Sequence, residues 1–243
     1  MEPIYRKTYS ITPAIVDLYR RLKPSFLLAF AQEVAGDHFR SFGIDLTTSD
    51  QRKLFWAVIR HRVQITRLPL EGETITIETW PLPTTRVAFP RSTVAYDANG
   101  NEVFRSISLW VLMDRDSRNM ILPGKSGVDV PGLIRGNELT APGSLGPKAL
   151  DRHFCHTVVY SELDCNGHVN NTKYLDWMDD LLPSAFHKEH PLKEFTICYL
   201  NEAMEGQQLD LNWELQDGPT QRVDAHRGEE KPERVFSAQA VYE

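Results

Sequence analysis

The chain has 243 residues, a length that suits one large domain or two small ones. Its formal net charge of −6 provides no general basic field and argues against a nucleic-acid partner, so an acidic partner would have to meet a local basic patch. Three cysteines, an odd and low number, fit a reducing compartment better than a disulfide framework.

The chain shows neither a signal peptide nor a membrane span. Its first residues lack the apolar core of a signal peptide. The longest apolar run, residues 26–31, is far shorter than the ~20 residues that cross a bilayer. We therefore expect a cytoplasmic protein.

The first half predicts an apolar helix over residues 24–39. Pro24 suits the first helical position, and Phe26, Phe30 and Val34 share one face. Apolar residues also lie beside that face, which indicates a helix wrapped by other structure.

Antiparallel strands are expected after this helix. Residues 59–65 alternate between apolar and polar, the period of a half-buried strand. Residues 74–80 are rich in β-branched side chains, and Asn99-Gly100 indicates a hairpin turn between strands at 92–96 and 103–113.

A connection rich in proline and glycine, residues 123–152, separates this half from a second one. There the patterns predict a helix over 172–182 and a polar, charged loop opening at Asp217-Gly218. The strands expected in the second half are 157–160, 195–200, 209–215 and 235–242.

The two halves repeat one plan. Glu71-Gly72 matches Glu205-Gly206, 134 residues further on, and residues 24–28 overlay residues 171–175. Each half is therefore an α+β unit with a helix first and antiparallel strands after it.

The densest polar run in an apolar setting is Leu163 to Asn171, between an expected strand and the second helix. Asn170, Asn171 or Thr172 can cap that helix, whose N-terminus would direct N–H groups at the loop. An imidazole, a carboxylate and an amide beside such donors suit stabilisation of an oxyanion. The alternative is a capped turn with a surface histidine, because Asp, Asn and Gly form turns readily.

The pattern Asp-x-Asn-x-His-Val-Asn-Asn-x-x-Tyr, from Asp164 to Tyr174, resembles the signature of the acyl-acyl-carrier-protein thioesterases of plant plastids and bacteria. The likeness extends through most of the chain. Its other segments are residues 55–60, Pro69, residues 71–73, residues 79–80 and residues 106–113.

This resemblance implies a fold and a division of the chain. The expected fold is a double hot dog, two tandem halves in which an antiparallel sheet wraps a central helix. The first half, residues 1–122, would bind the acyl chain, and the second, residues 153–243, would carry the chemistry.

The resemblance also implies hydrolysis of fatty acyl-[acyl carrier protein] with no metal and no organic cofactor. The implied catalytic residues are Asp164, Asn166, His168 and Glu202, with Glu205 as a competitor for the last position. Family members often carry cysteine after this glutamate, whereas this chain has Ala203, which favours attack by water. The residues expected to bind substrate are Trp56, Phe26, Phe30, Asn170 and Asn171.

Individual roles stay open at this point. Either His168 or Glu202 could deprotonate water. Asp164 could orient His168 or Asn166, and Asn166 could hold water or donate to the carbonyl oxygen.

Arg60, Arg62 and Arg67 lie on one expected strand and its end, and would form the patch that docks an acidic acyl carrier protein. The alternative for each is a solvated strand face. A homodimer, the acyl chain length and the choice between carrier protein and coenzyme A are open. Rival functions are an acyl-CoA thioesterase, a hydroxyacyl-thioester dehydratase and a non-catalytic acyl-binding module.

Overall fold

The computed structural model describes residues 2–41, 53–216, 218–228 and 230–243. In the first half the elements are β1 (Tyr5–Ser10), α1 (Pro24–Ser41), β2 (Leu54–Ile65), β3 (Thr74–Pro81), β4 (Phe89–Tyr96), β5 (Glu102–Asp114) and β6 (Met120–Ile121). After the short helix α3 (Pro123–Ser126), the second half contains β7 (Arg152–Thr157), α4 (Lys173–Asp180), α5 (Ser184–Glu189), β8 (Leu192–Tyr199), β9 (Gln208–Gln216), β10 (Thr220–Arg227) and β11 (Glu233–Tyr242). Two 3-10 turns, η1 (Pro13–Ile15) and η2 (Tyr160–Glu162), precede the two main helices.

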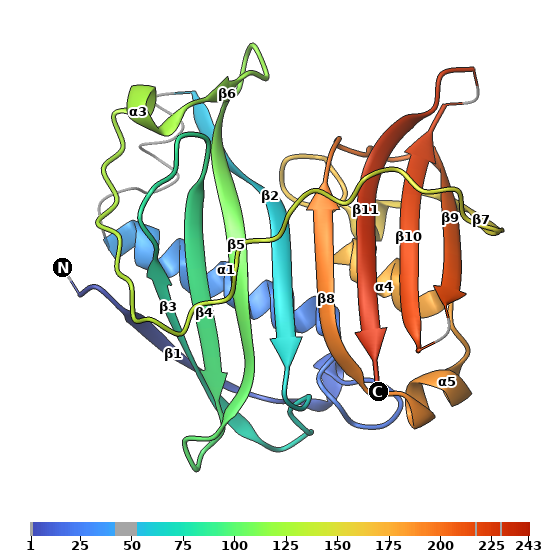
Figure 1. The fold of residues 1–243 in the computed structure, drawn as a ribbon, viewed down its shortest axis with the longest axis horizontal. Coiled ribbons are helices and arrows are strands. Elements are labelled where there is room, and N and C mark those ends of the chain that lie inside the picture. Colours follow the sequence, from blue (N-terminus) through green and yellow to red (C-terminus); the bar gives the residue numbers. More distant parts are fainter. Residues whose placement is uncertain (1, 42–52, 217, 229) are drawn as a thin grey trace.

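One antiparallel sheet of eleven strands runs through the described part of the chain, in the order β1-β3-β4-β5-β2-β8-β11-β10-β9-β7 with β6 beside β5 (Figure 1). The two halves join where β2 pairs with β8, from Arg60 opposite Cys198 to Gln64 opposite Glu194. This join makes a single sheet from two five-stranded copies, and β6 is its eleventh strand.

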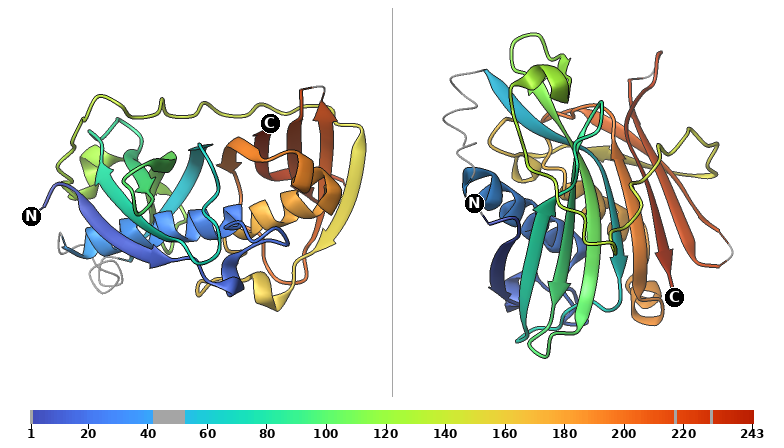
Figure 2. Two further views of the ribbon diagram at one scale, coloured as in Figure 1. Left: turned by 90° about the horizontal axis from the view of Figure 1, so that it is seen from below. Right: turned by 60° about the vertical axis from the view of Figure 1, so that its left-hand side comes forward.

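Both main helices lie on one face of the sheet (Figure 2). The face of α1 turned to the sheet includes Leu27, Leu28 and Val34, which are fully buried. Tyr174 and Trp177 of α4 pack against Phe236 of β11. A central helix wrapped by an antiparallel sheet in each half is the double hot-dog fold that the sequence predicted.

The repeat is also present in the backbone hydrogen bonds. Asp17 N donates to Arg21 O at 2.7 Å, and Asp164 N donates to His168 O at the same distance in the second half. Leu22 N bonds Pro69 O in the first half as Val169 N bonds Ala203 O in the second. Because these bonds match, Asp17, Arg21 and Leu68 occupy the positions of Asp164, His168 and Glu202.

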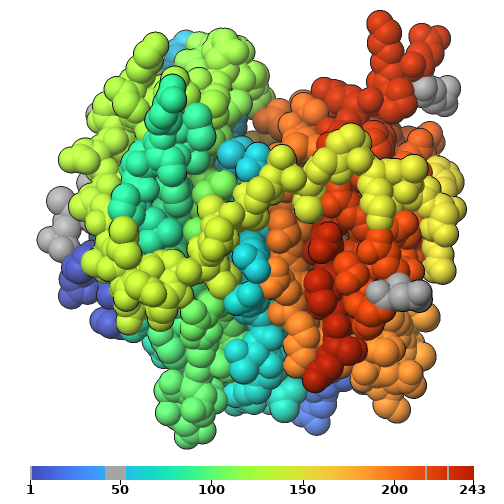
Figure 3. All heavy atoms as spheres, in the orientation of Figure 1, coloured from blue at the N-terminus to red at the C-terminus, as the bar shows by residue number. Residues whose placement is uncertain are grey.

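The connection between the halves crosses the face of the sheet opposite the helices (Figures 1 and 3). We call residues 127–151 the strap. It lies against β3, since Leu133 N donates to Pro81 O at 2.8 Å. Arginine side chains from three strands bond strap carbonyls: Arg60 to Pro142, Arg222 to Gly146 and Arg234 to Leu145.

The structure corrects the expected second half in two places. Residues 220–227, within the region expected to be a polar loop, form strand β10, because the buried Asp224 is paired with Arg222 and Arg234. The strand expected at 157–160 lies earlier, at β7. Its exposed residues show no apolar alternation, and η2 follows it. No helix in the described ranges is long and apolar enough to cross a membrane.

Candidate active site

The loop from Leu163 to Asn171 connects η2 to α4 and is folded around Asp164. One oxygen of this carboxylate, Oδ1, accepts hydrogen bonds from the backbone N–H groups of Asn166 at 2.8 Å and His168 at 3.2 Å. Gly167, at φ 79°, makes the left-handed turn that closes the loop. The loop therefore has a fixed shape, which the hydrogen bonds to the Asp164 side chain set.

Asp164 also holds the side chain of Asn166. Its second oxygen, Oδ2, accepts from Asn166 Nδ2 at 3.2 Å, and this leaves the amide oxygen of Asn166 available as an acceptor. Of the two roles that the sequence left open for Asp164, the geometry supports orientation of Asn166.

The imidazole of His168 faces a different carboxylate. His168 Nε2 lies 3.3 Å from Glu202 Oε2, and the His168 side chain is only 12% exposed. An isolated β-bridge between His168 and Met204 brings the Glu202 segment beside the loop. Ala203, at the position where the resembled family often has cysteine, is fully buried.

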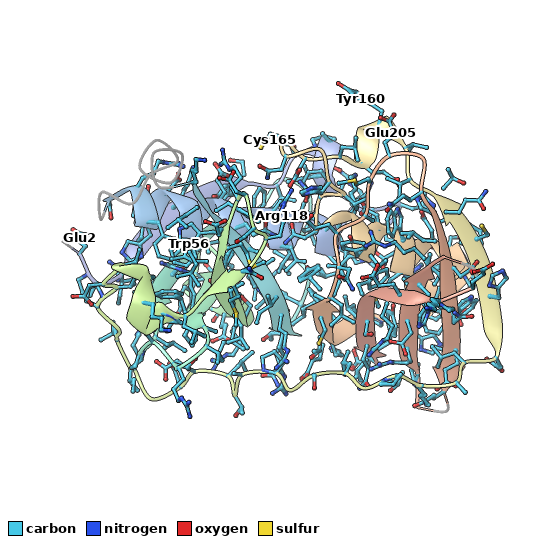
Figure 4. The ribbon with its side chains drawn as sticks, turned by 90° about the horizontal axis from the view of Figure 1, so that it is seen from above. Glu2, Trp56, Arg118, Tyr160, Cys165 and Glu205 are labelled. Carbon is cyan, nitrogen blue, oxygen red and sulfur yellow. The ribbon has the colours of Figure 1, made fainter. Side chains whose placement is uncertain are left out.

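Arg118 is a member of this cluster that sequence reasoning missed. Its Nη1 donates to Glu202 Oε1 at 2.9 Å, so Glu202 lies between an imidazole and a guanidinium. Figure 4 shows Arg118 between the two halves of the molecule. It lies in the turn between β5 and β6, far from the motif, and no local pattern marks it.

A cavity of about 290 Å³ joins these groups to an apolar wall. The second half contributes Asp164, Asn166, His168 and Glu202, and the first half contributes Gln32, residues 55–59 and Trp110. Trp56 stacks on Phe39 with ring centroids 4.7 Å apart and meets Phe89 edge-on at 4.9 Å. The site is thus built by both halves.

Two residues expected at the acyl chain lie elsewhere. Phe26 and Phe30 are outside the lining of this cavity and pack against the main core. Phe30 stacks on Tyr9 with centroids 4.1 Å apart. Their role in substrate binding stays a prediction.

The two asparagines before α4 have different surroundings. Asn170 Oδ1 accepts from Thr172 N at 3.0 Å and from the Thr172 hydroxyl at 2.9 Å, a turn just before α4, whose N-cap residue Thr172 makes no side-chain capping bond. Asn171 lines the cavity with Tyr199. Burial raises the pKa of Tyr199 well above its ordinary value, and its hydroxyl has no hydrogen-bond partner among the described residues.

Glu162 lies just before the loop, outside the lining of the cavity, and stabilises the loop through hydrogen bonds. It accepts hydrogen bonds from Val159 N, His156 Nε2 and Trp177 Nε1, the last at 2.7 Å. Burial by itself would raise the pKa of Glu162, but these bonds outweigh it and lower the pKa. Asn170 N also donates to the backbone carbonyl of Glu162, so the loop is hydrogen-bonded to a residue whose own side chain has several partners.

The predicted docking arginines have partners within the chain. Arg62 makes a two-point ion pair with Glu194, at 2.8 and 3.2 Å, and Arg67 pairs with Glu73 and Asp97. Arg60 bonds the strap. A role in docking stays a prediction for these residues.

A larger cavity, of about 580 Å³, lies at the matching position of the other half, where Arg21 and Leu68 stand in place of His168 and Glu202. The smaller cavity is the better candidate because it holds the imidazole–carboxylate pair. Among the described residues, no group of three or more His, Cys, Asp or Glu side chains could hold a metal ion.

Two family models match the chain. The model of the acyl-ACP thioesterase N-terminal domain matches residues 2–122, and that of the acyl-ACP thioesterase C-terminal domain matches residues 149–235. The chain is 27% identical to the chloroplastic dodecanoyl-[acyl-carrier-protein] hydrolase of Cinnamomum camphora over 217 residues, 82% of this chain and 56% of the relative. It is 28% identical to the chloroplastic oleoyl-acyl carrier protein thioesterase 1 of Arabidopsis thaliana over 201 residues, 74% of this chain and 55% of the relative. The chain thus spans about half the length of these relatives.

Solved structures share the fold. An acyl-ACP thioesterase from Bacteroides thetaiotaomicron superimposes with a TM-score of 0.90 at 22% identity, covering 99% of this chain and 98% of the other. The 12:0-ACP thioesterase of Umbellularia californica gives 0.83 at 24% identity, covering 100% and 98%.

Proposed function

Because the chain belongs to the acyl-ACP thioesterase family, we propose that it hydrolyses the thioester of a fatty acyl chain carried on acyl carrier protein. The products are the free fatty acid and the carrier with its thiol. The first half (residues 1–122) holds the acyl chain, the second half (residues 153–243) carries the chemistry, and residues 123–152 connect them.

The observation that carries the proposal is the contact of His168 with Glu202 at 3.3 Å, on the wall of a cavity whose other side is apolar. Thioester hydrolysis needs a base that activates water and a surface for the acyl chain. Trp56, beside Phe39 and Phe89, supplies such a surface next to the pair.

In the proposed reaction, water attacks the carbonyl carbon and loses a proton to the His168–Glu202 pair. The electron pair of the C=O bond moves to the carbonyl oxygen, and then returns as the C–S bond breaks. The thiolate takes the proton back, so one water is consumed for each thioester. The free oxygen of Asn166, held by Asp164, is placed to accept a hydrogen bond from the water. The chain has Ala203 after Glu202, so no cysteine at that position forms an acyl intermediate.

Thiol release from a panel of acyl thioesters tests the function. Each chain length is presented on acyl carrier protein and on coenzyme A, with His168→Ala measured in parallel. We expect kcat/KM to be higher on carrier protein, and His168→Ala to lose ~100-fold in kcat, the scale of acid–base catalysis. Faster release from coenzyme A would favour an acyl-CoA thioesterase. Binding without release would favour an acyl-binding module, and formation of an unsaturated thioester would favour a dehydratase.

The partner, location and assembly belong to the same proposal. The carrier is expected to dock at the mouth of the cavity, where the acyl chain must enter. Cytoplasmic location and a homodimer stay predictions, which cell fractionation and sedimentation would measure.

A further inference from the structure

The backbone of the site loop uses most of its own hydrogen-bond donors. The N–H groups of Asn166, Gly167 and His168 all bond Asp164. Asn170 accepts those of Thr172 and Lys173, so the first turn of α4 is largely satisfied. Of the loop residues that line the cavity, Asn171 has a backbone N–H without a hydrogen-bond partner among the described residues. The Asn171 N–H is therefore available for the charge that develops on a thioester carbonyl oxygen.

A side-chain donor from the other half faces the same cavity. Gln32 lies in the middle of α1 and lines the cavity together with His168, Asn166 and Glu202. Its amide nitrogen, Nε2, is buried and has no hydrogen-bond partner among the described residues. A buried donor without a partner costs free energy, so its retention in a cavity points to an acceptor supplied by the ligand.

The repeat provides an internal comparison for this residue. By the offset that relates the two helices, Gln32 corresponds to Asp179 of α4, which lines the larger cavity of the other half. That cavity has Arg21 and Leu68 where the proposed active site has His168 and Glu202. Burial raises the pKa of Asp179 to about 8, so this side chain loses its donor proton as the pH rises through that value, whereas a carboxamide donates at every pH. The half with the catalytic pair thus has a donor that does not depend on pH.

Resting on the proposed function, we infer that Gln32 is a further catalytic residue whose Nε2 donates to the carbonyl oxygen of the thioester, together with the Asn171 backbone N–H. The hydrogen bond strengthens as water adds to the carbonyl carbon and the oxygen becomes negative. It weakens again as the C–S bond breaks and the carboxylic acid forms. Catalysis in one half then needs a side chain from the helix of the other half.

Kinetics of Gln32→Met test this role, because methionine keeps the length of the side chain and removes the donor. We expect kcat to fall ~100-fold or more, the scale measured for an oxyanion donor, with KM changed less than about threefold. Asp179→Asn is the matched control and should turn over like wild type. A Gln32→Met enzyme with near-normal kcat, or with a loss confined to KM, overturns the inference.

A binding experiment separates this inference from the proposed function. Two unreactive analogues are attached to the thiol of acyl carrier protein: an S-alkyl thioether, which lacks the carbonyl oxygen, and an S-(2-oxoalkyl) ketone, which keeps one. Wild type should bind the ketone more tightly, and Gln32→Met should lose about three- to tenfold of this preference, the worth of one hydrogen bond. Trp56→Phe, which removes another of the buried donors on the cavity wall that have no partner among the described residues, should keep this preference.

The outcomes are distinct. An undiminished preference for the ketone in Gln32→Met, or a preference lost in Trp56→Phe alone, overturns the role of Gln32 even if wild type is an active thioesterase. If wild type releases no thiol from any acyl carrier, the proposed function fails, and the catalytic part of the inference fails with it. Thermal melting of each variant within a few degrees of wild type shows that the fold is intact.

Discussion

Glu202 is the residue on which the proposed chemistry depends most, because it contacts both His168 and Arg118. The glutamine variant keeps its shape and removes its charge. We expect Glu202→Gln to lower kcat by ~100-fold or more, since the imidazole loses its charged partner.

Glu205, the alternative to Glu202 in the sequence analysis, provides the control. Glu205 is exposed and lies outside the lining of the cavity. Glu205→Gln should therefore hydrolyse the fatty acyl thioester of acyl carrier protein at close to the wild-type rate. Equal losses in the two variants would mean that the segment as a whole, rather than Glu202, supports turnover.

His61 gives a prediction about stability and pH. It is 1% exposed on β2, and neither ring nitrogen has a hydrogen-bond partner among the described residues. Burial lowers its pKa to about 3, whereas an unfolded chain titrates histidine near ~6.5. The unfolded state therefore takes up a proton first as pH falls. The stabilisation is complete above pH ~6.5 and is lost between there and pH ~3.

Phenylalanine is the natural replacement, because Phe195 occupies the matching position of the second half. We expect the melting temperature of His61→Phe to fall less than that of wild type between pH 7 and pH 4.5, as scanned calorimetrically. Parallel curves for the two proteins would show that His61 does not contribute to acid unfolding.

At the scale of elements, the sequence periodicity identified those helices and strands whose pattern is set by the burial of apolar side chains. The apolar positions of α1 and the alternation in β2 and β9 follow directly from which side chains face the core. Strand β10 could not be found this way, because its sequence includes Arg222, Asp224 and Arg227 and its burial depends on partners in other segments. The same reason hid Arg118, whose partner Glu202 is far away in sequence. Asp164, Asn166 and His168 were identifiable because they are neighbours in one loop.

We expect one substitution in β10 to have a large effect on the free energy of unfolding. Asp224 is fully buried, 3.1 Å from both Arg222 and Arg234, and also accepts from Lys148 N of the strap. Removing it leaves a buried guanidinium without its carboxylate, which typically costs about 3–5 kcal/mol. Asp224→Ala should lower the free energy of unfolding by this amount in urea titrations.

The exposed ion pair of Lys53 with Asp116 is the comparison. Both side chains are mostly in solvent, where charge pairs contribute little. Asp116→Ala should leave the urea midpoint unchanged. An Asp224→Ala midpoint equally close to wild type would mean that the pairs beneath the strap do not stabilise the fold.

For the whole molecule, the repeat predicts one active site per chain. In the first half Asp17 is retained, but it makes an ion pair with Arg21 at 2.8 Å, and Leu68 replaces the glutamate. That half has no imidazole–carboxylate pair at the matching position with which to activate water.

A tight, unreactive thioester mimic should titrate one equivalent per chain in calorimetry. Replacing Asp164, His168 and Glu202 together should abolish hydrolysis entirely. Two equivalents bound per chain, or hydrolysis that survives the triple replacement, would mean that the first half has a working site of its own.

The hydrogen-bonded join of β2 with β8 also governs how the molecule melts. Pulling the halves apart would expose two bare strand edges in the middle of a continuous sheet, and would break the cavity to which both contribute. A state with one half folded and the other unfolded is therefore unfavourable, although each half repeats the same plan. We expect a single heat-absorption peak whose van't Hoff and calorimetric enthalpies agree, the behaviour of one thermodynamic unit rather than of two linked domains.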